Sequence, residues 1–324
     1  MMHVLVTGGA GYLGSVLVPL LLKHGHQVSV VDDLLHGGHS LLSYIYDDNF
    51  RFIKGDVRSN GPQVDVLDGV DAIVHLAAIV GDAACARQPE TARQVNLDAS
   101  LSLYDKARKH GVRRFVFAST CSNYGRMPNG AGFLDEESPL SPVSLYARTK
   151  VEVEKALLAA GDSVQPAVTI LRCSTLYGLS PRMRFDLTVN EFTRDLVTKR
   201  HLVIFGGQFW RPYIHVRDAA EVFRLVLTAP LECVAGQVFN AGDSDQNFQK
   251  DQLVEMIRAQ LDFETQVEQV EKQEDPRDYR VSFAKIRKHL AFCPSRTVED
   301  GIREVRTAIE DGLIPDVENP RYRN

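Results

Sequence analysis

The first residues of the chain switch from a short apolar run to glycines and then to a longer apolar run. Val4, Leu5 and Val6 precede the glycine-rich residues 7–14, and an almost wholly apolar segment follows from Val16 to Leu22. Short apolar runs bounded by glycine are typical of buried strands, and longer ones of buried helices. The pattern predicts a strand, a tight turn and a buried helix, with a kink at Pro19 because proline removes a helical hydrogen bond.

Short apolar runs and longer amphipathic segments alternate along the following residues. Further strands are expected at 27–31, 50–54, 72–76, 114–118, 168–172, 202–205, 237–241 and 265–270. Helices are expected at 89–110, 144–160, 187–199, 217–228, 250–261, 283–289 and 298–311. Alternating strands and helices predict an α/β fold with a doubly wound parallel sheet. The pattern loosens after residue 172, and residues 315–324 are expected to form a frayed tail.

The glycines of the first turn have the spacing of a dinucleotide-binding site. Gly8, Gly11 and Gly14 recur every three residues, directly before the first predicted helix. Glycines at such positions permit positive φ and close approach of the backbone to a pyrophosphate, and the helix N-terminus attracts the anion. Asp32 ends the second strand, where a carboxylate can bind both hydroxyls of an adenosine ribose and repel a 2′-phosphate. The sequence therefore favours NAD over NADP.

Other candidate residues follow the ends of later strands, where ligands bind in such sheets. Asp56 comes directly after the third strand and is either a contact to an adenine ring or a cap of a turn. Ala77 and Ala78 follow the fourth strand, and their small side chains let a flat group cross the strand end.

Composition narrows the class of protein. The 324 residues carry a net charge of −5, which gives no basic face for nucleic acid. No apolar run is long enough to span a bilayer, and the N-terminal residues lack the pattern of a secretory signal. The five cysteines are scattered without C-x-x-C spacing, which argues against disulfides and a zinc site. We expect a cytoplasmic protein that binds no metal.

A tyrosine and a lysine four residues apart supply candidate chemistry. Tyr146 and Lys150 share one face of a predicted helix. A tyrosine is a poor base at neutral pH, but a neighbouring ammonium and a positive nicotinamide ring both favour its phenolate. Thr120, at the end of the fifth strand, has a hydroxyl that can relay the proton.

Taken together, these motifs resemble those of extended short-chain dehydrogenases/reductases of the nucleotide-sugar epimerase/dehydratase family. The resemblance runs from Met2 to about Ile309 and rests on residues 7–14, Asp32, 56–57, 75–78, Asn96, 119–125, 146–150 and 211–218. It implies a Rossmann domain at 1–172, to which some later segments return, and a smaller C-terminal substrate-binding lobe at 173–324. It also implies a homodimer, joined through a four-helix bundle built from the helices around 89–110 and 144–160.

The same resemblance implies which residues of this chain contact NAD. They are Gly8, Gly11, Tyr12, Leu13, Gly14, Asp32, Asp56, Val57, Leu76, Ala77, Ala78, Asn96, Tyr146, Lys150 and Cys173.

Contacts to a nucleoside diphosphate sugar are implied in the same way. The candidates are Cys121, Ser122, Thr175, Arg182, Arg184, Asn190, Val203, Arg211 and Arg277. Arg211 resembles the family's arginine for the diphosphate, and a planar guanidinium suits that anion. The others have ordinary structural alternatives: solvated arginines, a helix-surface asparagine, a core valine and a buried thiol.

Two departures from the family pattern bear on the reaction. Relatives that eliminate water resemble Thr-Asp-Glu at this strand end, whereas Cys121 and Ser122 follow Thr120 here. Neither is an acid or base at ordinary pKa values, so a 4,6-dehydratase is not expected. Thr175 stands where relatives usually have an asparagine.

The expected reaction is oxidation of a sugar hydroxyl, most simply at carbon 4, by NAD. A nucleotide-sugar epimerase is the first reading, and a net dehydrogenase or ketoreductase is the alternative, since both use the same residues. A non-catalytic NAD sensor is disfavoured because the chain keeps both Tyr146 and Lys150.

Overall fold

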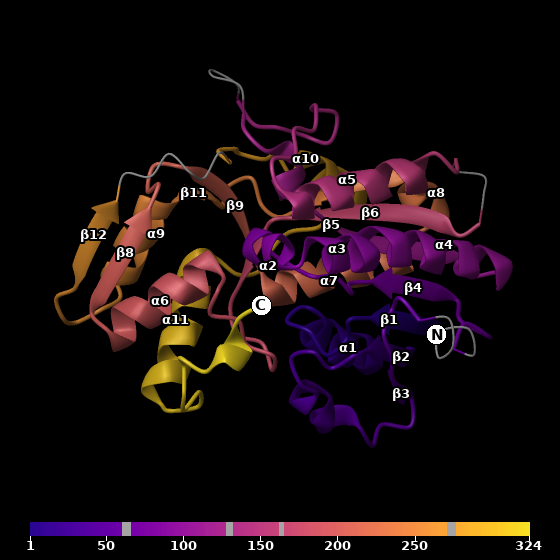
Figure 1. Ribbon diagram of the computed structural model, residues 1–324, viewed down its shortest axis with the longest axis horizontal. Helices are drawn as coiled ribbons and strands as arrows, with labels where there is room; N and C mark the ends of the chain where they lie inside the picture. The colour runs from indigo at the N-terminus through magenta and orange to yellow at the C-terminus, as the bar shows by residue number, and fades with distance from the viewer. Residues whose placement is uncertain (60–65, 128–131, 162–164, 271–276) are drawn as a thin grey trace.

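A parallel sheet forms the centre of the computed structural model, which describes residues 1–59, 66–127, 132–161, 165–270 and 277–324 (Figure 1). Its seven strands lie in the order β10-β6-β5-β4-β1-β2-β3, and all neighbours are parallel. The strands are β1 (His3–Thr7), β2 (Gln27–Asp32), β3 (Phe50–Lys54), β4 (Ala72–His75), β5 (Arg114–Thr120), β6 (Ala167–Cys173) and β10 (Gln237–Ala241). Chain order reverses between β1 and β4, which makes a crevice at their carboxyl ends.

The sequence encodes both faces of this sheet. Val4 and Val6 of β1 pack into one core, while Leu5 between them packs into the other. Side chains alternate between the faces of a strand, so a continuous apolar strand must be covered on both sides. The helices of the two faces provide that cover.

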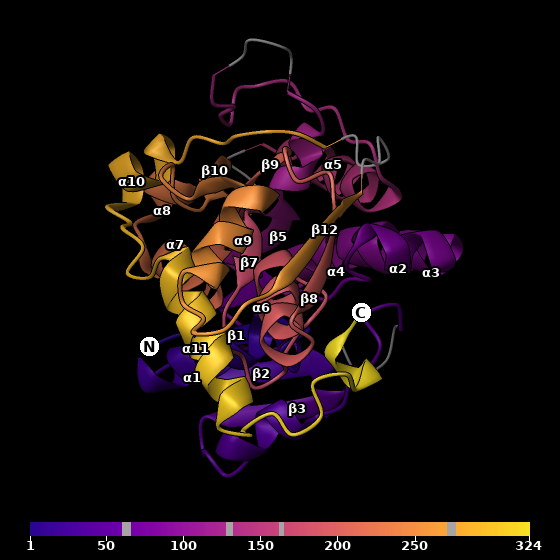
Figure 2. The ribbon, with the colours of Figure 1, turned by 90° about the vertical axis from the view of Figure 1, so that its left-hand side faces the viewer.

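Helices lie on both sides of the sheet (Figures 1 and 2). They are α1 (Gly14–Lys23), α2 (Asp82–Arg87), α3 (Pro89–Arg93), α4 (Ala99–Lys109), α5 (Leu145–Leu158), α7 (Val216–Thr228), α8 (Leu231–Val234) and α10 (Ala284–Leu290). The helix expected over 89–110 contains a π-helical turn, Gln94–Asp98, between α3 and α4. The expected helix at 16–22 is present as α1 and continues through Pro19.

The remaining elements gather beside the carboxyl ends of the large sheet (Figure 1). They are β7 (Thr175–Tyr177), β8 (His201–Phe205), β9 (Trp210–His215), β11 (Asn247–Gln249), β12 (Gln266–Val270), α6 (Thr188–Thr198), α9 (Lys250–Arg258) and α11 (Val298–Glu310). They form a sheet of order β11-β9-β7, a β12-β8 pair and a separate apolar core. The α/β, Rossmann-type fold is confirmed; β10 and α7 return to the large sheet, and the division at residue 172 stays a prediction.

One expectation is wrong: residues 315–324 are not frayed. Pro320–Tyr322 forms a 3-10 turn, and the Tyr322 carbonyl accepts a hydrogen bond of 2.8 Å from the Phe185 amide. The rings of Phe185 and Tyr322 pack edge to face at 5.6 Å. A polar, proline-bearing sequence gave no sign of this docking, because the partners that order the segment lie far away in the chain.

Candidate active site

The turn between β1 and α1 has the geometry that its glycines predict. Gly8 has φ of +75°, and a Cβ there would lie 2.7 Å from the Ala77 amide nitrogen. A Cβ on Gly14 would lie 2.4 Å from the Gly8 carbonyl oxygen. The turn is therefore closed to side chains, and the first turn of α1 faces the end of β4.

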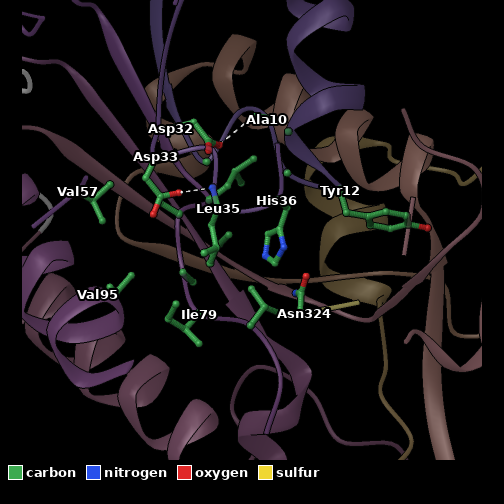
Figure 3. A pocket seen from close by; sticks show the side chains of 18 of the residues that line it. Ala10, Tyr12, Asp32, Asp33, Leu35, His36, Val57, Ile79, Val95 and Asn324 are labelled. Carbon is green, nitrogen blue, oxygen red and sulfur yellow. Dashed lines mark hydrogen bonds between the residues drawn. The ribbon is translucent and has the colours of Figure 1, made fainter. Parts of the chain in front are cut away.

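Asp32 lies at the carboxyl end of β2 and touches this turn. Its carboxylate accepts a hydrogen bond from the Ala10 amide at 2.9 Å (Figure 3) and another from the Leu34 amide at 2.8 Å. Burial raises the pKa of Asp32, and these two hydrogen bonds oppose the rise. The carboxylate is thus fixed beside the glycine turn, where the ribose of a dinucleotide is expected.

A single cavity of about 440 Å³ joins the turn to the catalytic candidates. Fourteen of the fifteen expected NAD contacts line it: Gly8, Gly11, Tyr12, Leu13, Gly14, Asp32, Asp56, Val57, Leu76, Ala77, Ala78, Tyr146, Lys150 and Cys173. These residues come from segments throughout the first half of the chain and from the end of β6. The fold thus brings the nucleotide-binding motif and the tyrosine–lysine pair to one cavity.

Asn96 is the exception, and the structure corrects its role. It is fully buried in the π-helical turn. Its side-chain oxygen accepts from the Ile79 amide at 2.8 Å, and its amide group donates to the Ile79 carbonyl at 3.0 Å. Asn96 therefore holds the loop after β4 in place, and Ile79 itself lines the cavity.

Several cavity residues were missed by sequence reasoning. They are Ile79, Val95, His36 and Asn324, and Figure 3 shows them around the cavity together with Val57, which was expected. Ile79 and His36 lie outside periodic segments, Val95 was expected only as an apolar position of the helix 89–110, and nothing in the sequence connects Asn324 with the glycine turn. Burial lowers the pKa of His36 to about 4, with Arg182 and Arg184 nearby, so its imidazole is neutral at physiological pH.

Lys150 is buried beneath the cavity and held by the sheet. Its ammonium donates to the Ala118 carbonyl at 2.8 Å and lies 4.6 Å from the ring centroid of Phe117. The distance from the ammonium to the Tyr146 ring centroid is 5.9 Å. Burial lowers the pKa of Lys150 to about 8, so at neutral pH the side chain is mostly charged.

The expectation that Lys150 lowers the pKa of Tyr146 does not describe the protein without cofactor. Burial dominates and raises the pKa of Tyr146 above its ordinary value. The half-buried phenol therefore keeps its proton in the protein without cofactor.

Thr120 ends β5 and caps a short 3-10 turn, Cys121–Tyr124. Its hydroxyl oxygen accepts from the Ser122 amide at 3.1 Å, which leaves the hydroxyl hydrogen for another acceptor. Ala118 and Ser119, the preceding residues, line the cavity. Thr120 itself is buried and is not among the residues that line the cavity, and its contact with a substrate stays a prediction.

The expected sugar contacts lie in different environments. Cys121 is buried in the core and donates to the Arg172 carbonyl, and burial raises its thiol pKa, so a substrate contact is not supported. Ser122, Thr175 and Val203 are half-buried on the turn, β7 and β8 respectively.

Asn190, Arg182 and Arg184 were also expected to contact the nucleoside diphosphate sugar. Asn190 is fully buried and hydrogen-bonds to Gly178, Tyr12 and Arg184, so it offers no surface to a phosphate. Arg182 and Arg184 line the cavity that contains both the glycine turn and Tyr146, so their contact with the sugar stays a prediction.

Arg211 and Arg277 lie together in the smaller part of the structure. Arg211 donates to the Arg277 carbonyl at 2.6 Å, and its guanidinium lies over the Tyr279 ring. Arg277 forms a 2.8 Å ion pair with Asp82, the first residue of α2. The two arginines thus face the sheet from its carboxyl-end side.

A sequence model described as the NAD dependent epimerase/dehydratase family matches residues 4–242. The chain belongs to this family. The chain is 30% identical to a UDP-glucose 4-epimerase of Corynebacterium glutamicum over 96% of this chain and 94% of that one. It is 32% identical to a dTDP-glucose 4,6-dehydratase of Streptomyces niveus over 98% and 92%.

Solved structures of enzymes with similar sequences have a similar fold. A UDP-glucose 4-epimerase of Thermotoga maritima with UDP-glucose has a TM-score of 0.84 and 27% identity, over 96% of this chain and all of that one. DesIV of Streptomyces venezuelae, a dTDP-glucose 4,6-dehydratase with NAD and TYD bound, has a TM-score of 0.83 and 29% identity, over 96% and 98%.

The cavity fits the family's cofactor. The glycine turn leaves space that side chains would fill, and Asp32, Tyr146 and Lys150 line the same cavity. The chain is an NAD-dependent enzyme of the epimerase/dehydratase family. Among the described residues, no helix has both the length and the apolar character to cross a membrane.

Proposed function

We propose that this protein is an NAD-dependent 4-epimerase of a nucleoside diphosphate sugar. The observation that carries the proposal is that Tyr146 and Lys150 line the same cavity as the glycine turn, in a chain of this family. Relatives over nearly the full length include enzymes that act on UDP-glucose and dTDP-glucose, which supports a nucleotide sugar as substrate.

The chain's own groups move one proton. NAD, which the glycine turn and Asp32 would hold, would supply a reversible hydride acceptor for the carbon that carries the hydroxyl. Tyr146 takes the hydroxyl proton as the ketone forms and gives it back when the carbinol is restored. The Lys150 ammonium, fixed on the Ala118 carbonyl, stabilises the phenolate against the burial that otherwise keeps Tyr146 protonated. Thr120, at the end of β5, relays the proton through its hydroxyl.

The residues after Thr120 favour epimerisation over elimination. A dehydratase needs an additional acid and base near the sugar. Cys121 is buried, and burial raises its thiol pKa further, while the hydroxyl of Ser122 is neutral and lies 3.4 Å from the Tyr279 hydroxyl. The identity with dTDP-glucose 4,6-dehydratases is as high as with epimerases, so these two positions decide the proposal.

Arg211 and Arg277 supply the charge for the substrate's diphosphate. A planar guanidinium can donate paired hydrogen bonds to phosphate oxygens, and the Arg211 guanidinium lies at the backbone of Arg277, to whose carbonyl it donates. Arg277 already pairs with Asp82, so binding of the diphosphate would replace this carboxylate by a phosphate as the partner of Arg277.

A panel of nucleotide sugars tests the proposal. The protein with NAD is incubated with UDP- and dTDP-linked hexoses while NADH absorbance and product NMR are followed together. A new C4 epimer without lasting NADH absorbance is the expected result. NADH accumulating in step with a released ketone would identify a dehydrogenase, and a 4-keto-6-deoxy sugar a dehydratase; either result refutes the epimerase.

The homodimer implied by the resemblance is also a proposal. α4 and α5 pack against each other, so both could contribute to a four-helix bundle between two copies. Light scattering on the purified protein tests it, and a monomer at micromolar concentration would contradict it.

A further inference from the structure

The last residues of the chain are packed against the part of the protein that carries Arg182. Ile314, Val317 and Tyr322 pack against a core cluster that includes Tyr12 and Phe185. Burial of these side chains and the amide–carbonyl bond between Phe185 and Tyr322 fix residues 314–322. Asn324, two residues beyond Tyr322, lines the cavity.

Asn324 connects two distant parts of the cavity wall. Its side-chain oxygen accepts a hydrogen bond from Arg182 at 2.7 Å, and its backbone N–H donates one to the Asp186 carboxylate at 3.2 Å. Its backbone carbonyl accepts from Arg87, which belongs to α2, at 3.0 Å. Asn324, Arg182 and Arg87 all line the cavity, and Figure 3 shows Asn324 beside it, near Ile79.

The segment that carries Arg182 is fastened to the glycine turn. The Tyr12 hydroxyl donates to the Gly178 carbonyl at 2.6 Å, and the Ser180 hydroxyl donates to the Tyr12 carbonyl at 2.7 Å. Ser180 also contacts the hydroxyl of Ser15 in the first turn of α1 at 2.8 Å. Arg182 therefore enters the cavity close to the end of α1 that attracts a diphosphate.

The guanidinium of Arg182 is placed for an anion that the protein itself does not supply. Arg182 is 94% buried, being 6% exposed, and its Nε has no hydrogen-bond partner among the described residues. Its Nη2 donates to two neutral oxygens, the Asn324 side chain and the Arg323 carbonyl. Arg184, by contrast, is already paired with both carboxylate oxygens of Asp186. A buried guanidinium without a carboxylate partner is unfavourable, and burial lowers the pKa of Arg182 to about 10.

We propose that Arg182, held by Asn324, is a second clamp on the diphosphate of bound NAD, and that residues 314–324 slow release of the cofactor. The inference rests on the NAD dependence of the family and not on the epimerase reaction. Asn324 orients Arg182 and also joins it to α2 through Arg87. Bound NAD can therefore leave the cavity only when these contacts open.

Binding measurements test the clamp without any turnover. ADP-ribose, adenosine and UDP are titrated calorimetrically into wild type and Arg182→Gln. Arg182→Gln removes a charged hydrogen bond to a buried anion. ADP-ribose is therefore expected to bind the variant at least about tenfold more weakly than wild type. Adenosine, which has no diphosphate, and UDP, which mimics the substrate's diphosphate, are expected to bind as in wild type.

Asn324→Ala keeps the arginine and removes only the group that holds it. Release of NAD, followed by displacement with excess ADP-ribose, is expected to be about threefold faster, on the scale of one neutral hydrogen bond. Arg321→Gln is the matched control, since Arg321 is an exposed arginine in the same segment, in contact with the Tyr322 ring. It should release NAD as wild type does.

The results that overturn the clamp are distinct. Unchanged ADP-ribose binding in Arg182→Gln removes the arginine from the NAD site, and equal loss for adenosine indicates a structural role. Loss for UDP alone assigns Arg182 to the substrate. Equal release rates in Asn324→Ala and wild type remove Asn324 and its segment from cofactor retention.

Discussion

Replacing Glu154 by glutamine tests the buried network behind the catalytic helix. Glu154 follows Lys150 by one turn of α5 and is 2% exposed. Its carboxylate accepts hydrogen bonds from Arg172 at 2.8 Å and from Asn123 at 2.8 Å, and from the Ser119 hydroxyl. Ser119 and Asn123 flank Thr120 and its turn, so Glu154 joins α5, β5 and β6 behind the active site.

The size of the expected loss in unfolding free energy follows from the Arg172 charge that Glu154→Gln leaves without a counter-ion. Burial alone lowers the pKa of Arg172, but the hydrogen bonds to Glu154 raise it above its ordinary value, so the guanidinium stays charged. Glutamine leaves that charge buried without its counter-ion, which lowers the free energy of unfolding by about 3 kcal/mol. Glu152→Gln is the matched control: it lies on the same helix, is exposed, and pairs with Arg93 at 3.6 Å. Its expected effect is under about 1 kcal/mol.

Urea unfolding of both variants, followed by fluorescence and circular dichroism, measures the difference. Turnover of Glu154→Gln should fall as well, because the turn after Thr120 loses one of its supports, while Glu152→Gln should keep wild-type turnover. Equal unfolding free energies for the two variants would refute the reasoning and show that the ion pair contributes no more than a surface pair does.

Three further predictions concern the cavity. Tyr146→Phe should abolish turnover and leave the dissociation constant for NAD nearly unchanged, since only the proton-transferring hydroxyl is removed; kinetics and calorimetry measure the two, and retained turnover excludes Tyr146 as the base. Asp32→Ala should weaken NAD binding and narrow the preference over NADP, measured by titration with each; an unchanged preference means that another group reads the ribose. Lys150 has a folded pKa of about 8 against an ordinary 10.5, so above pH 8 the unfolded chain binds more protons and stability rises with pH. The unfolding free energy of cofactor-free wild type, relative to Lys150→Met, should therefore increase by about 1 kcal/mol from pH 8 to 9; a flat difference means that Lys150 titrates normally.

The sequence alone determined the sheet and the nucleotide turn, because both depend on local patterns. The continuous apolar run of β1 specifies two covered faces, and only glycine fits at Gly8 and Gly14. Tyr146 and Lys150 could be found for the same reason, since their four-residue spacing places them on one helical face.

Tertiary structure decided what depends on contacts between distant residues. Asn96 supports the Ile79 loop, Asn190 is buried, and Arg182 lines the cavity of the glycine turn and is held there by Asn324. Asn324 reaches that cavity through side chains more than a hundred residues away in the chain, including Arg182 and Arg87. No periodicity records such contacts, because burial and hydrogen bonding between remote segments exist only after the chain has folded.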